Sequence, residues 1–500
     1  MQDYDYFCRC IHFLSPMSLD EILKKLDAET KSRMARKVPS WFDDSSSVIP
    51  GSSSVIPGSD RESLIFPSSL STQQCSSEKT ALYKARVASN ALLASRSPQG
   101  ACPPTDTGRG RGPLDTSSRQ RTQETMGGAG ESKANGVPLG AYCLPQGQIA
   151  DLTGGLGVDS WAFSKCFEKV LYNEANAELA EAVKHNFKVL GCSNIEISNR
   201  LLEPENLKDI LGDFEPDVIF LDPARRSAAG KKVFLLEDCQ PDVLKLKDEL
   251  LAASPNLLLK LSPMADITML LQRLGPAVRQ LHVVAFDGEC KDLLVWVQRN
   301  WSGPAELIIH EDGVTLGPFD RTSSLTSEQG MPGECTRMAI GHNFCPEGVL
   351  PGQIIYEPGK ALLKAGLFDY PCTLGYAKLA KHTHLYIAPD SFQETSFPTG
   401  SGISLPGKYF RIEKVLPLQS KTIKEIARQG ISAEVSTHNV PIKAEDLRTR
   451  LHATPSATSH LFAVGCSDSN YLLIAQRVMR NQSSLSPTPN WSYCPGGSLV

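Results

Sequence analysis

Long apolar runs are missing from this sequence, and none approaches the roughly 20 residues that a helix needs to cross a bilayer. The first residues, MQDYDYFCRCIHFLSP, are interrupted by Asp3, Asp5 and Arg9, and they lack a basic start followed by an apolar centre. We therefore expect no membrane-spanning segment, no signal peptide and no membrane partner. The expected location is cytoplasmic.

Paired cysteines and an excess of positive charge are missing as well. The 14 cysteines are scattered singly, so the sequence predicts neither a zinc ribbon nor a disulfide scaffold. His382 and His384 would point the same way on a strand, but no third ligand is near in the sequence, and we expect no metal site. A formal net charge of −4 excludes a uniformly basic coat for nucleic acid, while a local basic face remains possible.

Large apolar side chains are scarce in two segments of the chain. The heptapeptide SSSVIPG occurs twice in tandem at 45–51 and 52–58, which is too short an array for a solenoid. Residues 97–146 cannot bury enough apolar surface to offset the entropy of the chain, so they are predicted to be disordered. Helical spacing is present at 18–38 and 70–95.

From residue 147 onward, short apolar runs alternate with amphipathic spans. The runs are QIADLT, KVLYNE (169–174), NIEIS (194–198), DVIFLD (217–222), NLLLKLS (256–262) and QLHVVAF (280–286). Apolar runs of this length separated by helices indicate a parallel sheet covered on both faces. The predicted fold class is therefore α/β, with a Rossmann-like, doubly wound parallel sheet. After about residue 303 the alternation stops, and smaller α+β units are expected.

Three glycines follow the first predicted strand, in the stretch DLTGGLGVDS. Gly154, Gly155 and Gly157 would let a cofactor pack against bare backbone at the start of the next helix. The third glycine of a dinucleotide-binding loop is absent, because position 160 is Ser. Asp151 would repel a diphosphate but suits the ammonium of S-adenosylmethionine. A tight turn in another nucleotide-binding fold is the alternative.

The second strand ends in Glu174, which is placed to accept hydrogen bonds from ribose hydroxyls. The cofactor would then be S-adenosylmethionine. The predicted cofactor-binding residues are Asp151, Thr153, Gly154, Gly155, Gly157, Asp159, Glu174, Asn199 and Asp222.

The fourth strand ends in a second motif, DPARR, which resembles the (D/N)PP-type motif of methyltransferases acting on amines or nucleobases. Pro223 stiffens the turn, so that Asp222 can accept a hydrogen bond from the atom that receives the methyl group. Arg225 and Arg226 suit phosphate oxygens or a stacked base, or they pair with local acids. Ser262 ends the fifth strand, close to Lys260. Because Ser262 offers no thiol for covalent attack, direct methyl transfer to nitrogen is favoured.

These motifs together make the chain similar to the bacterial class I S-adenosylmethionine-dependent methyltransferases that carry a THUMP-like C-terminal domain. The resemblance covers QCSSEKTALYKA, DLTGGLGVDS, NEAN, FLDPARR, LKLSPMADI, GECKDLL, YEPGKALLKAG, HTHLY and KYFRIEKVLPL. It implies a Rossmann-like catalytic domain, a small ferredoxin-like domain, a THUMP-like end and RNA binding. Two departures are the low-complexity insertions and His438, which stands where a basic residue is expected.

The predicted organisation follows from the patterns and the resemblance together. Its parts are a helical segment (1–44), a linker (45–69), a second helical segment (70–96), a disordered insertion (97–146), a methyltransferase domain (147–302), a ferredoxin-like domain (303–394), a linker (395–407), a THUMP-like domain (408–478) and a flexible tail (479–500).

The leading hypothesis is methyl transfer to a base nitrogen of structured RNA, either tRNA or rRNA. The catalytic residues would be Asp222, Pro223, Arg225, Arg226 and Ser262. Part of an RNA-binding surface could come from Lys408, Arg411, Lys414, Lys421, Lys424 and Arg428, although a solvated surface charge is the favoured role for any one of them taken alone. The alternatives are methylation of a protein or small-molecule amine, and a non-catalytic RNA-binding protein with a vestigial methyltransferase fold.

Overall fold

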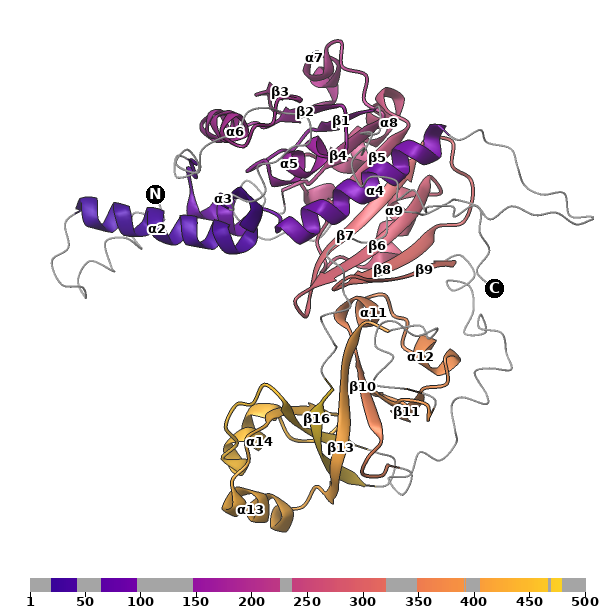
Figure 1. The fold of residues 1–500 in the computed structure, drawn as a ribbon. Helices are drawn as coiled ribbons and strands as arrows, with labels where there is room; N and C mark the ends of the chain where they lie inside the picture. The colour runs from indigo at the N-terminus through magenta and orange to yellow at the C-terminus, as the bar shows by residue number, and fades with distance from the viewer. Residues whose placement is uncertain are drawn as a thin grey trace, which may run out of the picture. The chain divides into compact units, whose positions relative to one another are not determined.

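A computed structural model describes residues 19–42, 64–96, 147–224, 236–320, 349–390, 392, 405–465 and 469–478. The chain divides into two compact units, Met1–Arg200 with Asp213–Val218, and Leu201–Gly212 with Ile219–Val500. Its strands form a nine-stranded sheet in the order β3-β2-β1-β4-β5-β7-β6-β8-β9 and a seven-stranded sheet in the order β11-β12-β10-β13-β16-β15-β14 (Figure 1).

The first unit contains three parallel strands and two crossover helices. These are β1 (Gln148–Asp151), α5 (Val158–Ser164), β2 (Lys169–Asn173), α6 (Ala177–Val189) and β3 (Ile195–Ser198). Helix α6 begins where the side chain of Asn176 accepts a hydrogen bond from the backbone N–H of Leu179, and it buries Val183 and Phe187. The predicted alternation of strand and helix is confirmed here.

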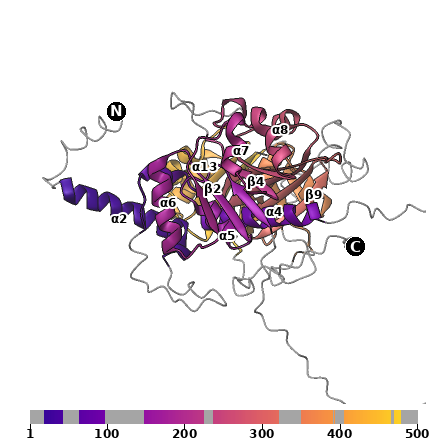
Figure 2. The ribbon, with the colours of Figure 1, turned by 90° about the horizontal axis from the view of Figure 1, so that it is seen from above.

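The N-terminal helices belong to the same first unit. They are α2 (Leu19–Lys37), the short helix η2 (Pro39–Trp41), α3 (Ser69–Gln74) and α4 (Glu78–Arg96). Helix α4 lies along α5, as both ribbon views show (Figures 1 and 2). The buried Trp41 ring meets Trp161 of α5 edge to face, with ring centroids 6.1 Å apart. Asn186 of α6 bonds both backbone groups of Ile65, each at 2.8 Å.

These contacts make the N-terminal helices part of the core of the first unit. The helices predicted at 18–38 and 70–96 are present. The predicted insertion at 97–146 lies outside the described residues. The predicted linker at 45–69, with its SSSVIPG repeats, lies outside them as well, except for its last residues, 64–69.

The second unit contributes the rest of the nine-stranded sheet. Its elements are η5 (Pro204–Asn206), α7 (Leu207–Leu211), β4 (Val218–Leu221, whose first residue belongs to the first unit), η6 (Leu236–Asp238), α8 (Val243–Ala253), β5 (Asn256–Leu261), α9 (Ile267–Leu274), β6 (Val278–Phe286), β7 (Glu289–Gln298), β8 (Glu306–Glu311) and β9 (Val314–Asp320).

Strand β7 departs from the parallel sheet that the sequence predicts. It lies between β5 and β6 and pairs antiparallel with both. The hairpin β6–β7 turns through Asp287 and Gly288, whose φ angles of 54° and 76° are those of a type I′ turn. The sheet also continues through β8 and β9 to Asp320. The predicted end of the methyltransferase domain at 302 is therefore too early.

The seven-stranded sheet also lies in the second unit. Its elements are β10 (Ile354–Pro358), α11 (Lys360–Lys364), α12 (Tyr370–Thr373), β11 (Ala377–Ala380), β12 (Thr383–Ile387), β13 (Gly407–Pro417), α13 (Ser420–Gln429), β14 (Glu434–His438), α14 (Ala444–Leu451), β15 (Ser459–Gly465) and β16 (Asn470–Arg477). The long strand β13 pairs antiparallel with both β10 and β16. The two predicted α+β domains thus share one sheet, although the sequence predicts two bodies separated by a linker at 395–407.

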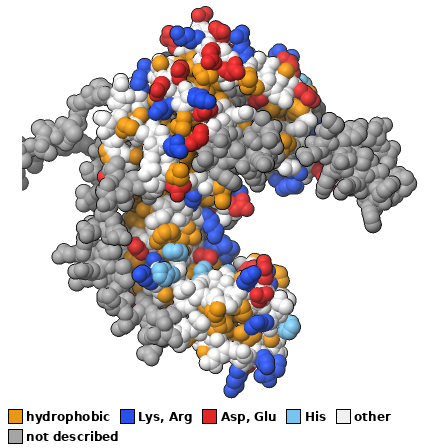
Figure 3. Space-filling view, turned by 180° about the vertical axis from the view of Figure 1, so that it is seen from behind, with side chains coloured by type: hydrophobic (Ala, Val, Ile, Leu, Met, Phe, Trp, Pro, Cys, Tyr) orange, Lys and Arg blue, Asp and Glu red, His pale blue; other side chains and the backbone are white. Residues whose placement is uncertain are grey.

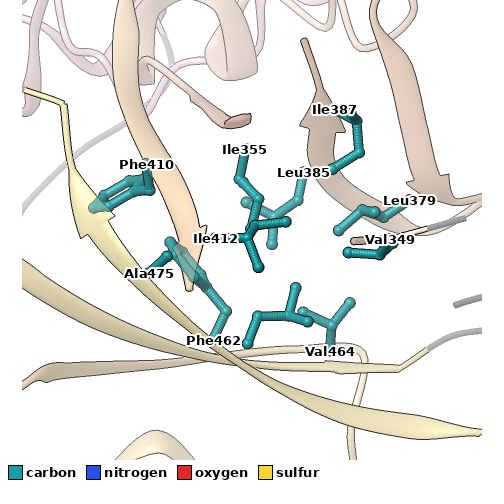
Figure 4. Packing of buried hydrophobic residues seen from close by; sticks show 11 residues of the cluster. Val349, Ile355, Leu379, Leu385, Ile387, Phe410, Ile412, Phe462, Val464 and Ala475 are labelled. Carbon is teal, nitrogen blue, oxygen red and sulfur yellow. The ribbon is translucent and has the colours of Figure 1, made fainter. Parts of the chain in front are cut away.

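Two apolar clusters cover the faces of this sheet. One joins both halves of the sheet around Ile355, Leu385, Ile412 and Phe462 (Figure 4). The other lies beneath α13 and α14, which bury Ile423, Ile426, Leu447 and Leu451 against the opposite face. Successive residues of β15 belong to the two clusters in turn, Leu461 and Ala463 to one and Phe462 and Val464 to the other, as the twofold side-chain period of a strand requires.

Candidate active site

The glycine loop closes tightly onto the end of β2. The backbone N–H of Gly154 donates to the carbonyl of Asn173 at 2.8 Å, and the Tyr172 hydroxyl donates to the carbonyl of Gly155 at 2.6 Å. Gly155 and Gly157 have φ angles of 53° and 79°, in the region that favours glycine. Two of the predicted cofactor residues thus have a backbone conformation that few other residues adopt.

Side-chain packing requires glycine at two positions of the loop. A Cβ at Gly154 would lie 2.1 Å from the Tyr172 ring, and a Cβ at Gly157 would lie 2.7 Å from the Phe187 ring. The rings of Tyr172 and Phe187 meet edge to face, with centroids 5.5 Å apart. The loop backbone at Gly154 and Gly157 therefore rests directly on the protein's own aromatic rings, and that internal packing by itself requires glycine at these two positions.

Asp151 is fully buried where β1 ends. The Ser160 hydroxyl donates to its carboxylate at 2.6 Å, and the backbone N–H of Thr153 donates at 3.3 Å. Ser160 is itself fully buried in the first turn of α5. Position 160, where a dinucleotide-binding loop has its third glycine, is thus a serine that orients the Asp151 carboxylate at the end of β1.

Glu174 is half-buried and binds the loop through its carboxylate. One oxygen accepts from the backbone N–H of Gly155 at 2.9 Å, and the other accepts from the N–H of Asn176 at 2.8 Å. The exposed Asn199 donates its side-chain amide to the carbonyl of Glu174 at 2.6 Å. A carboxylate has about four lone-pair positions, so two remain for further donors such as hydroxyl groups.

Two carboxylates lie close to the Tyr172 phenol, whose hydroxyl bonds the loop. Burial raises the pKa of the Tyr172 phenol, and the nearby charges of Glu174 and Asp151 raise that pKa further.

Asp159 has partners from the N-terminal helices. Its carboxylate pairs with the ammonium of Lys84 at 2.7 Å and accepts from the Ser76 hydroxyl at 2.8 Å. The sequence predicts a direct cofactor contact for Asp159, whereas its side chain is 10% exposed and engaged with Lys84 of α4 and with Ser76, which lies between α3 and α4. Its place next to the glycine loop is as predicted.

The DPARR motif follows β4 in the second unit. Asp222 forms an ion pair with Lys260, whose side chain is 4% exposed, whereas that of Asp222 is 27% exposed. Pro223 is buried, and Ala224 forms an isolated bridge with Gln240. Arg225 and Arg226 lie outside the described residues. The carboxylate of the motif is thus anchored on one side and accessible on the other.

Two residues of β5 and its end belong to this part of the site. Ser262 is 8% exposed, and its hydroxyl accepts from the backbone N–H of Met264 at 3.2 Å. Lys260 is not among the predicted site residues. Its place in the sequence does indicate a special role, because a lysine inside a strand that is buried at every position needs an acidic partner.

Metal and membrane features can be judged only for the described part of the chain. In these ranges no group of three or more His, Cys, Asp or Glu side chains is arranged to hold a metal ion. None of the described helices combines the length and the apolar character that a bilayer crossing requires.

Two family matches cover the C-terminal part of the chain. Residues 407–477 match the THUMP domain-like family, and residues 355–398 match a ferredoxin-like domain. The first match agrees closely with the predicted THUMP-like domain at 408–478. The second begins well after the predicted start at 303, because β8 and β9 belong to the nine-stranded sheet.

The chain is also similar to solved structures. A protein from Porphyromonas gingivalis W83, provisionally named a methyltransferase, matches with 26% identity and a TM-score of 0.60, over 90% of this chain and 88% of its own. An rRNA methylase from Streptococcus thermophilus matches over 31% of this chain and 88% of its own, with 15% identity and a TM-score of 0.24. A SAM-dependent methyltransferase from Aquifex aeolicus matches over 31% and 83%, with 17% identity and a TM-score of 0.23. No curated protein matches the sequence.

The match to the Porphyromonas gingivalis protein over 90% of this chain, together with the two family matches, supports a methyltransferase with a THUMP-like domain. The architecture of the chain is that of a methyltransferase with a ferredoxin-like domain and a THUMP-like C-terminal domain. The resemblance found in the sequence is thereby confirmed.

Proposed function

We propose that this protein transfers the methyl group of S-adenosylmethionine to a base nitrogen in structured RNA, either tRNA or rRNA. The observation that carries the proposal is the glycine loop, with the carboxylates of Asp151 and Glu174 at the ends of its two flanking strands. These two carboxylates suit a ligand that bears an ammonium and a sulfonium, and they would repel a diphosphate.

The residues of the first unit would hold the cofactor. The lone pairs that Glu174 retains suit the two ribose hydroxyls, and the backbone at Gly155 is open, because a Cβ there would meet nothing closer than 4.0 Å. S-adenosylmethionine would supply an electrophilic methyl group on sulfur. Asp151 is fully buried and held by Ser160 and Thr153, so it would contribute its negative charge from beneath the loop and would make no exposed contact with the ligand.

The residues of the second unit would orient the acceptor. Lys260 anchors the Asp222 carboxylate, whose accessible side can accept a hydrogen bond from an N–H group of the target base. Pro223 lacks an N–H donor, so it cannot compete for that carboxylate. A hydrogen bond from the base to the fixed carboxylate would place the nitrogen and withdraw its proton as the new N–C bond forms and the methyl–sulfur bond breaks, which leaves the cofactor as a neutral thioether.

The THUMP-like domain supports RNA as the substrate. Helix α13 buries Ile423 and Ile426, whereas Lys421, Lys424 and Arg428 are exposed. Lys and Arg side chains gather at the α13 end of this domain (Figure 3). Cations on one helix face can follow a phosphate backbone. Lys408, Arg411 and Lys414 are exposed on β13, where Arg411 also bonds the carbonyl of Gly352 at 3.0 Å.

The test is methyl transfer from S-adenosylmethionine labelled in its methyl group to RNA from a strain that lacks this gene. We expect label in RNA, loss of the label after ribonuclease treatment, and one methylated nucleoside by mass spectrometry. Label in protein or small amines would instead support the alternative acceptors. RNA binding without any transfer would support a vestigial methyltransferase fold.

A further inference from the structure

A buried cluster joins the N-terminal helices to the first turn of α5. The ammonium of Lys84 lies 2.7 Å from Asp159 Oδ1 and 2.5 Å from the Ser76 hydroxyl, which donates to Asp159 Oδ2 at 2.8 Å. The exposed fractions of Lys84, Ser76 and Asp159 are 1%, 7% and 8%. Three polar side chains are thus enclosed together, and each has the other two as partners.

Burial makes this cluster a strong constraint on geometry. A lysine charge removed from water is unfavourable by several kcal/mol unless an acid compensates it at close range. Removing one partner alone would leave the other charge buried without compensation. The ion pair between Lys84 and Asp159 therefore fixes the position of α5 relative to α4, because lengthening it would raise the free energy steeply.

Asp159 is followed by the residue that orients the acid at the end of β1. Ser160 comes next in the same turn and donates to Asp151 at 2.6 Å. Gly157, with its left-handed φ of 79°, is the residue that starts this turn. A shift of the first turn of α5 would thus move Ser160, Asp151 and the glycine loop together.

We propose that Lys84 and Ser76 are positioning residues for the cofactor, which act through Asp159 on the glycine loop. Asp159 then serves as the link between α4 and the loop and makes no direct contact with the cofactor. The N-terminal helices are consequently part of the cofactor site. This inference rests on the proposed function, because the proposed function names S-adenosylmethionine as the cofactor that the glycine loop would bind.

A double-mutant cycle tests the link. We expect Lys84→Met to weaken S-adenosylmethionine binding about tenfold or more, which corresponds to ~1.4 kcal/mol, as measured by calorimetry. Asp159→Asn should weaken binding similarly, because it leaves the lysine charge buried. The double variant removes both charges and should regain most of the affinity. If the double variant binds as weakly as Asp159→Asn, Asp159 contacts the cofactor directly and the proposal is wrong.

Two variants of α4 serve as controls. Val87→Ala removes buried apolar volume from the same helix, and Lys79→Met removes an exposed charge. Both should bind S-adenosylmethionine like the wild type. Should Lys84→Met fail to fold, Ser76→Ala removes only one hydroxyl from the cluster and should still weaken binding measurably. An affinity equal to the wild type in Ser76→Ala would then overturn the proposal.

Amide hydrogen exchange without any ligand gives an independent readout. Backbone amides of Gly154–Gly157 and of the first turn of α5 should exchange faster in Lys84→Met, and should be protected again in the double variant. Unchanged exchange in Lys84→Met would contradict the proposal. If the wild type binds no S-adenosylmethionine, the proposed function fails, while this exchange measurement still decides whether Lys84 holds the loop.

Discussion

Glu174 bonds the backbone N–H groups of Gly155 and Asn176 with its two carboxylate oxygens, so one side chain ties the glycine loop to the start of α6. This arrangement gives Glu174 two tasks in the proposed function. It shapes the loop, and its remaining lone pairs would accept the ribose hydroxyls of the cofactor.

Glu174→Gln should therefore impair cofactor binding. An amide group would place N–H donors against one of the two backbone N–H groups, and it would lose one acceptor for the ribose. We expect the affinity for S-adenosylmethionine to fall about tenfold, a change of ~1.4 kcal/mol in binding free energy. Calorimetric titration measures it, and Glu178→Gln, at an exposed acid in the first turn of α6, is the control. Equal affinity in both variants would argue against a ribose contact.

Gly154→Ala should destabilise the protein through a steric clash. The new methyl group would lie 2.1 Å from the Tyr172 ring, which is buried and bonded to Gly155, so the ring cannot move aside without losing contacts. We expect a loss of about 1–3 kcal/mol in the free energy of unfolding, measured by chemical denaturation. Gly212→Ala is the comparison for backbone strain alone, because a Cβ there meets nothing within 4 Å although the φ of 54° would strain an alanine. A loss at Gly154 clearly below about 1 kcal/mol would contradict the packing account.

Substitutions at Asp222 should separate its charge from its capacity to accept a hydrogen bond. At saturating S-adenosylmethionine, Asp222→Ala should lower the rate of methyl transfer about a hundredfold, because the target nitrogen loses its acceptor. Asp222→Asn keeps one acceptor oxygen and should retain part of the rate. Single-turnover transfer to RNA is the measurement. If the Ala variant matches the wild type, Asp222 has no role in orienting the acceptor.

Two histidines of the THUMP-like domain should make its stability depend on pH. The Ser436 hydroxyl bridges His438 and His460, at 3.3 Å and 2.9 Å from the two Nε2 atoms. Burial, together with nearby positive charges, lowers the pKa of each histidine from the ordinary 6.5 to about 4. The charges are Lys360 and His384 around His438, and Lys408 and Arg477 around His460.

The sign of the effect follows from proton uptake. Between about pH 6.5 and 4 the unfolded chain binds protons at these histidines and the folded chain does not, so stability falls as the pH decreases. The steepest slope is about 1.4 kcal/mol per pH unit for each histidine. Denaturation midpoints at several pH values should show a flatter profile in a variant with His438→Gln and His460→Gln. An identical profile in both proteins would contradict buried, neutral histidines.

The parallel part of the catalytic sheet could be predicted from the sequence because each of its strands is a short apolar run followed by an amphipathic helix. The acids Asp151, Glu174 and Asp222 were found for the same reason, since each one follows or ends such a run. Strand β7 was not predicted. Its first residues, Glu289–Asp292, are mostly polar, and its place between β5 and β6 depends on long-range pairing.

The buried ion pairs could be predicted only in part. Lys84 and Asp159 belong to segments separated by the long insertion, and nothing in either segment specifies the other as a partner. The sharing of one sheet by the last two domains was also not predicted, because β13 begins the THUMP-like domain in the sequence and yet pairs with β10 on its other side. Pairing of distant strands is decided by packing, which local patterns do not record.

The central claim is that the glycine loop binds a positively charged sulfonium nucleoside. Calorimetric titration of the purified chain with S-adenosylmethionine and, separately, with NAD tests it most directly. The account predicts binding of S-adenosylmethionine with one site per chain and no binding of the diphosphate. Binding of NAD, or no heat with S-adenosylmethionine, would contradict it.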